Sequence, residues 1–178
     1  MNILIKSIDN ISNFFGYAAG TLMILGTMLT ILEITFRFFL NSTLYITTEY
    51  LGYFMVAISF LGLALTLKDK EHIRITFLHK LIKKGKPRII LDFFTFVVGG
   101  IVSFFILIGT TKFFLHSLDI GSQSTQISNT YLFIPQFSIV LGSFMLFIQF
   151  ISEILKYTKA IQNKELDLEE GESQFLGH

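Results

Sequence analysis

The sequence predicts an all-α integral membrane protein with four transmembrane helices and a basic amphipathic segment between the second and the third. Composition is the first reason: 52% of the 178 residues are hydrophobic and only 15% are charged, whereas soluble domains have about 25% charged residues. The second reason is length, because four apolar stretches reach the roughly 20 residues that a helix needs to cross a bilayer.

These four stretches define the expected helices, at about residues 14–36, 47–67, 89–115 and 131–155. Helices are expected because lipid offers no partner to backbone N–H and C=O groups. The stretches are continuous and lack the alternation of β-barrel strands. We therefore expect one transmembrane domain over residues 1–160. Residues 161–178 carry five acids and no Lys or Arg after Lys164, which predicts a disordered acidic tail.

Basic residues are unevenly distributed among the connections. Eight of the 14 Lys and Arg residues fall between Lys68 and Arg88, and residues 116–130 contain none. Further lysines follow the fourth stretch, at Lys156, Lys159 and Lys164. Because cytoplasmic loops collect Lys and Arg, we expect the second connection and both termini in the cytoplasm, and the first and third connections outside.

The second connection has a helical pattern of its own. Ile73, Phe77 and Leu81 recur at helical spacing among basic residues, which is typical of a segment lying in the plane of the lipid headgroups. A short solvated helical hairpin is the alternative. The first 13 residues are also mildly amphipathic, and they are expected either to extend the first helix or to lie flat.

The centres of the four spans contain no ionisable residue; their polar groups are the hydroxyls of Thr27, Thr30, Ser59, Ser103 and Ser143. Ionisable groups at depth mark ion and substrate paths, whereas hydroxyls can bond to their own helix. The sequence also lacks cysteines, paired intramembrane histidines for a haem, zinc-ligand spacing and a phosphate-binding loop. We therefore expect no enzyme activity, no cofactor, no metal site and no nucleic-acid partner.

Ionisable residues gather near the ends of the spans. Glu33 and Arg37 are four apart, so they share a helix face and can pair, and Glu49 begins the second span on the same side. These three are expected to form one charged cluster, with snorkelling to water as the alternative. Snorkelling is the expectation for three further residues, namely Asp92, Lys112 and Glu153.

Small and aromatic residues suggest helix contacts. Gly16 and Gly20 form a small-xxx-small motif that permits close helix approach, and Gly52, Gly62 and the pair Gly99-Gly100 are expected to act likewise. The third span is rich in phenylalanine, which makes it a candidate docking wall for a larger membrane subunit, although lipid alone would explain it.

The order of several motifs is informative. Arg37 is followed by a short outer loop and Glu49, then by Phe-Leu-Gly-Leu-Ala-Leu at 60–65 and Lys-Glu-His-Ile-Arg-Ile at 70–75. Later come Ile134-Pro135, with Pro135 in the first turn of the fourth span, and Gly142. This order resembles the small membrane subunit (DctQ type) of tripartite ATP-independent periplasmic, or TRAP, transporters, over about residues 14–155. The family often has a Trp shortly before the Glu, where Thr47 and Thr48 stand here.

The resemblance implies a non-catalytic scaffold in the bacterial inner membrane, part of a sodium-coupled importer of an organic acid such as sialic acid or a C4-dicarboxylate. The implied partners are a large multi-helix membrane subunit, which would hold the substrate and sodium sites, a periplasmic substrate-binding protein, and membrane lipids. The third and fourth helices or the Phe-rich faces would pack on the large subunit. Arg37 and Glu49 would order the outer face where the binding protein docks, and His72 and Arg74 would anchor the inner interface.

Two other functions fit the residues. An autonomous four-helix channel or exporter could form a homo-oligomeric pore lined by hydroxyls and backbone, without any deep charge. A membrane assembly factor or anchor would have no transport role at all.

Overall fold

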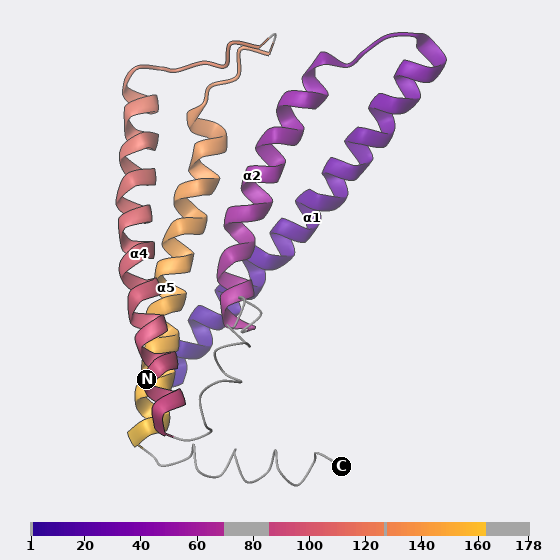
Figure 1. Ribbon diagram of the computed structural model, residues 1–178. Helices are drawn as coiled ribbons and strands as arrows, with labels where there is room; N and C mark the ends of the chain where they lie inside the picture. Colours follow the sequence, from indigo (N-terminus) through magenta and orange to yellow (C-terminus); the bar gives the residue numbers. More distant parts are fainter. Residues whose placement is uncertain (1, 70–85, 127, 163–178) are drawn as a thin grey trace, which may run out of the picture.

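A computed structural model describes residues 2–69, 86–126 and 128–162. They form four helices: α1 (Asn2–Leu40), α2 (Tyr45–Lys68), α4 (Lys86–Asp119) and α5 (Phe133–Gln162) (Figure 1). All four are long and apolar enough to cross a membrane. The predicted all-α fold with four spanning helices is thereby confirmed. The amphipathic segment and the acidic tail lie almost wholly outside the described residues.

The helices extend beyond the apolar stretches that predicted them. α1 starts at Asn2, so the N-terminal segment extends the first helix instead of lying flat. The exception is the start of α5, at Phe133 instead of the predicted Tyr131. Tyr131 belongs to the preceding loop, because it forms an isolated antiparallel bridge with Gln123. This bridge closes the loop of residues 120–132 into a hairpin.

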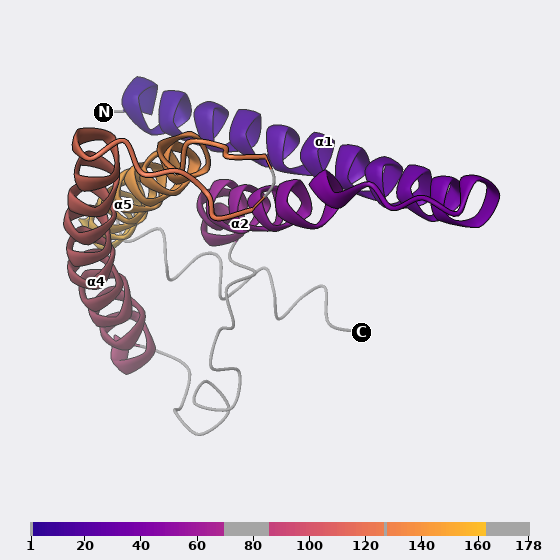
Figure 2. The same cartoon turned by 90° about the horizontal axis from the view of Figure 1, so that it is seen from above.

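The four helices lie in a row and do not close into a bundle (Figures 1 and 2). α5 packs between α4 and α2, and α2 packs between α5 and α1. α1 also touches α5, whereas α4 has no comparable contact with α1 or α2. We call the end where α1 starts and α5 stops the terminal end, and the end with residues 41–44 and 120–132 the loop end. The two helix pairs spread apart toward the loop end (Figure 1).

A glycine lies at each of the three main contacts in the row. The glycines and the residues they touch are Gly16 with Leu65 (α1–α2), Gly142 with Phe60 (α2–α5) and Gly99 with Phe150 (α4–α5). A Cβ at Gly142 would overlap the main chain of Phe60, so the helix axes can approach this closely only without a side chain there. Close approach is thus confirmed for Gly16 and Gly99. No helix of the described chain makes such an approach at Gly20, Gly52 or Gly62, where nothing described lies within 4 Å of a Cβ.

Few large apolar side chains in the described residues are buried, and many are exposed. In the most apolar window of each span, the buried share falls from 39% in α5 to 6% in α1. A small core cluster lies between α1 and α2, around Ala19, Ala57 and Leu61. A chain with its apolar residues on the outside is stable in lipid, where packing of small residues replaces the hydrophobic effect as the force that joins helices.

Candidate functional site

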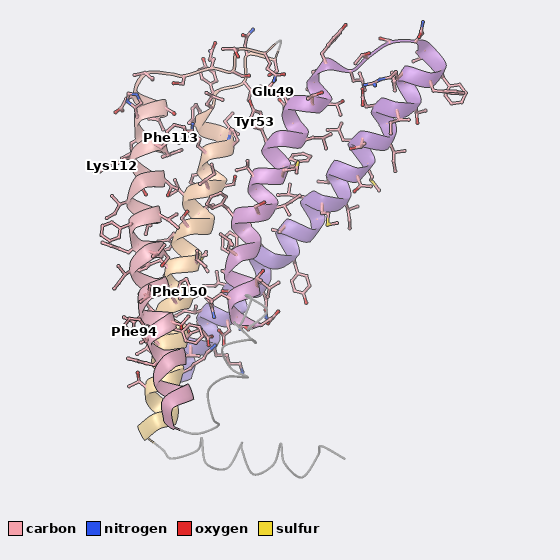
Figure 3. The ribbon with its side chains drawn as sticks, in the orientation of Figure 1. Glu49, Tyr53, Phe94, Lys112, Phe113 and Phe150 are labelled. Atoms are coloured by element: carbon pink, nitrogen blue, oxygen red, sulfur yellow. The ribbon has the colours of Figure 1, made fainter. Side chains whose placement is uncertain are left out.

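Polar side chains form a cluster at the loop end. Glu49, in the second turn of α2, is only 6% exposed. Its carboxylate accepts hydrogen bonds from the hydroxyls of Tyr53 and Ser128. Ser128 has a single hydroxyl proton, so Thr130, at 2.7 Å, is the donor in the Ser128–Thr130 hydrogen bond. Figure 3 shows Glu49 and Tyr53 together at the loop end of α2.

This loop-end cluster, consisting of Glu49, Tyr53, Ser128 and Thr130, joins α2 to the hairpin loop between α4 and α5. Hydrogen bonds to an ionised carboxylate are stronger than those between neutral groups. The cluster therefore fastens two parts of the chain at the end where the helices spread apart.

The predicted cluster of Glu33, Arg37 and Glu49 is only partly present. Glu33 and Arg37 form the expected ion pair on α1, with the Arg37 side chain 62% exposed. Within the described residues Glu49 makes no ion pair with Arg37. The three-residue cluster is therefore wrong, because the Glu49 carboxylate turns to the hairpin loop instead of to α1.

A second cluster lies at the terminal end, between the first turns of α1 and the last turns of α5. The Ser12 hydroxyl donates to the Gln149 side-chain oxygen at 2.7 Å, and the Gln149 amide donates to Asp9 at 3.1 Å and Glu153 at 3.3 Å. The Lys156 ammonium lies 2.9 Å from Asp9 and 2.7 Å from Glu153. The five residues form a continuous network, which we call the terminal-end cluster.

Three of the five residues in the terminal-end cluster are buried. Gln149 and Ser12 are fully buried and Glu153 is 1% exposed. Burying a carboxylate is costly unless it is paired and hydrogen-bonded, and here both conditions are met. The expectation that Glu153 snorkels to water is therefore wrong. A signal was visible in the sequence, because Gln149, Glu153 and Lys156 recur on one face of α5.

Of the other predicted site residues, the structure describes Pro135 but not His72 or Arg74. Pro135 lies in the first turn of α5, as expected, and its carbonyl accepts a hydrogen bond from the Ser138 hydroxyl at 2.6 Å. His72 and Arg74 lie outside the described residues. The two polar clusters thus come mainly from residues that the sequence did not single out, above all Asp9, Ser12 and Ser128.

Residues 26–159 match the family model described as tripartite ATP-independent periplasmic transporters, DctQ component. The chain belongs to the DctQ family. It is a small membrane component of a TRAP transporter, as the order of its motifs predicted. No curated protein sequence matches the chain.

The DctQ match includes α2, α4 and α5 almost entirely but only the loop-end part of α1. Glu49, Ser128 and Pro135 therefore lie inside the matched region. Asp9 and Ser12 precede it, so the terminal-end cluster joins the unmatched start of this DctQ subunit to its matched fourth span.

Proposed function

We propose that this DctQ subunit is a non-catalytic scaffold of a sodium-coupled importer for an organic acid, such as sialic acid or a C4-dicarboxylate. The distribution of polar groups supports this most strongly. In the described spans the ionisable residues lie toward the helix ends, and those of the two clusters bind to the chain's own residues. Ionisable groups at depth mark ion and substrate paths, so the substrate and sodium sites would lie on the large subunit.

The hydroxyls at mid-depth agree with a scaffold role. Thr27, Thr30, Ser59 and Ser103 each donate to a carbonyl of their own helix, at 2.8–2.9 Å. A hydroxyl used in this way leaves little capacity for a passing solute. Ser143 differs, because it is buried on α5 without a described partner.

The proposed setting is the bacterial inner membrane, with both termini and the basic connection between α2 and α4 in the cytoplasm. The loop end would then face the periplasm. In that orientation the loop-end cluster holds the hairpin loop in place where the binding protein docks, and the exposed Arg37 lies on the same side. A role for His72 and Arg74 at the cytoplasmic interface stays a prediction.

The large membrane subunit would cover one flank of the row, and charge favours α1 for this contact. The loop-end part of α1 lies beside α2 (Figure 1). It exposes many large apolar side chains, among them Met23, Ile24, Met28, Ile31, Phe38 and Phe39. Its two charged residues, Glu33 and Arg37, already pair with each other. A protein can therefore cover α1 without leaving either charge unpaired. The Phe-rich α4, the flank predicted from the sequence, carries a lysine without a described partner.

Affinity purification in mild detergent, followed by identification of the co-purifying membrane proteins, tests this function. We expect a large multi-span protein to co-purify. Photo-crosslinking residues at Met28 on α1 and Phe105 on α4, which are 62% and 67% exposed, then compare the two flanks. Stronger crosslinking from Met28 supports the α1 contact. The scaffold proposal fails if the chain purifies without any other membrane protein.

A further inference from the structure

The outward side of α4 carries one continuous stripe. Among the described helices, α4 packs substantially only on α5, and the exposed residues on the opposite side recur at helical spacing. From the terminal end to the loop end they are Phe94, Val98, Ile101, Phe105, Lys112, His116 and Asp119. Figure 3 shows Phe94 and Lys112 on the side of α4 away from α5. We call these seven residues the α4 outer stripe; its lower part is apolar and its loop end is charged.

Lys112 and Asp119 are unpaired charges on this stripe. The other ion pairs in the described residues satisfy Arg37, Lys68 and Lys156, but neither Lys112 nor Asp119 has a hydrogen-bond or ion-pair partner within the described part of the chain. An unpaired ammonium inside a membrane span is costly. Lys112 therefore requires an anion from outside the described part of the chain, or water.

The depth of Lys112 indicates where that anion lies. Lys112 is the only Asp, Glu, Lys or Arg residue in the fourteen-residue stretch from Phe105 to Leu118. Phe113 and Leu115 are exposed beside it. Lys112 precedes the end of α4 at Asp119 by seven residues, which is about 10 Å at 1.5 Å per residue. A lysine at this depth extends its ammonium to the headgroup layer. His116, one turn closer to the surface on the same side, adds a ring N–H donor.

The order of charges along the stripe selects the headgroup. An ammonium, a ring N–H donor and then a carboxylate follow one another toward the surface, at Lys112, His116 and Asp119. A phospholipid whose phosphate is followed by a primary ammonium has the complementary order, with the phosphate deeper and the ammonium farther out. A purely anionic headgroup would place its charge near the Asp119 carboxylate without compensation.

We propose that the α4 outer stripe binds one phosphatidylethanolamine molecule. Lys112 and His116 bind its phosphate, Asp119 accepts hydrogen bonds from its ammonium, and an acyl chain lies along Phe105, Ile101 and Val98. A lysine ammonium is a common phosphate ligand because its charge is compact. The α4 flank is then the lipid-facing side of the subunit. Lipid binding at this flank does not depend on whether the chain assembles with a large subunit.

Lipid retention by the purified full chain tests the proposal. Native mass spectrometry would count phospholipids bound to the wild type after delipidation and readdition of dioleoyl-phosphatidylethanolamine, -phosphatidylglycerol or -phosphatidylcholine. We expect one retained phosphatidylethanolamine, bound roughly tenfold more weakly by Lys112→Gln, a loss of about 1.4 kcal/mol. Lys112→Arg should retain it. Lys6→Gln, which changes an exposed lysine at the other end, is the matched control and should behave as the wild type.

Asp119→Asn separates the two parts of the headgroup. It should remove the preference for phosphatidylethanolamine over phosphatidylglycerol while phosphate binding through Lys112 persists. Equal retention by the wild type and Lys112→Gln, both eluting as folded monodisperse protein, would overturn the proposal. So would a loss of co-purifying protein in Lys112→Gln with unchanged lipid retention, because Lys112 would then pair with a carboxylate of a protein partner.

Discussion

The hydroxyl of Ser128 donates a hydrogen bond to the carboxylate of Glu49, although the two residues are 79 positions apart. Glu49 belongs to α2 and Ser128 to the hairpin loop between α4 and α5. The bond therefore joins the two halves of the chain at the loop end, where their helices no longer pack tightly.

Replacing Glu49 should loosen the hairpin loop. In Glu49→Ala, Tyr53 and Ser128 lose their shared acceptor, so amide hydrogen exchange in residues 120–132 should speed up severalfold while the middle of α5 stays protected. Glu33→Ala is the control, because its partner Arg37 is exposed and surface pairs contribute little. Unchanged exchange in Glu49→Ala would mean that the loop is held by other contacts.

The glycine contacts should be sensitive to a single methyl group. Gly142→Ala places a Cβ against the main chain of Phe60, which cannot move aside as a side chain can, so we expect a loss of about 1–3 kcal/mol in thermal unfolding in detergent. Gly62→Ala on α2 has open space and should be neutral or slightly stabilising, because Ala favours a helix more than Gly does. Equal effects of the two substitutions would contradict the packing described for α2 and α5.

Removing the lysine of the terminal-end cluster should destabilise the chain. Lys156→Met leaves Asp9 and the buried Glu153 without a cation. We expect a loss of about 3 kcal/mol or less, because Lys156 is 30% exposed and solvent screens part of the charge. Adding Glu153→Gln should recover part of this loss. Denaturant unfolding of the single and double variants measures their free energies of unfolding. If the double variant were less stable than Lys156→Met, the Glu153 carboxylate would not depend on the Lys156 ammonium for its compensation.

Transport should require more than this chain. Vesicles reconstituted with the purified subunit alone should show no saturable flux of sialic acid, a C4-dicarboxylate or sodium, because the ionisable groups of its described spans lie toward the helix ends. Adding a large subunit and its binding protein should produce uptake. Saturable flux through the chain alone would support an autonomous channel or exporter.

Arg37 should matter for uptake more than for folding. Its side chain is 62% exposed and pairs only with Glu33 in the described structure. Arg37→Ala should therefore leave thermal stability nearly unchanged but lower uptake by the assembled importer through weaker docking at the loop end. Normal uptake together with normal complex yield in Arg37→Ala would show that Arg37 is not part of the docking surface.

The sequence predicted the number of helices and their order because hydrophobicity and length are direct consequences of the lipid environment. It did not predict the row, since helices that are apolar on all sides give no sign of which faces meet. The contact of Gly142 with Phe60 depends on that arrangement. Gly62 shows the same limit, because its small size suggested close packing that does not occur within the described chain.

The polar clusters were harder to predict. Glu49 stood out as an acid at a span end, but its partner Ser128 lies in a loop, and spacing along one helix says nothing about such a contact. Glu153 appeared free to snorkel because Asp9 was outside the expected first span. Once α1 is seen to start at Asn2, Asp9 and Ser12 lie beside α5, and the polar face of α5 has its partners.

The central position of α5 has a consequence for biosynthesis. The ribosome releases α1, α2 and α4 before α5, yet α5 separates α4 from α2 in the finished subunit. α4 and the α1–α2 pair therefore gain the helix on which both of them pack only when α5 has been inserted. A chain that stops before Phe133 lacks this partner, so its α4 has no substantial packing contact with the other described helices.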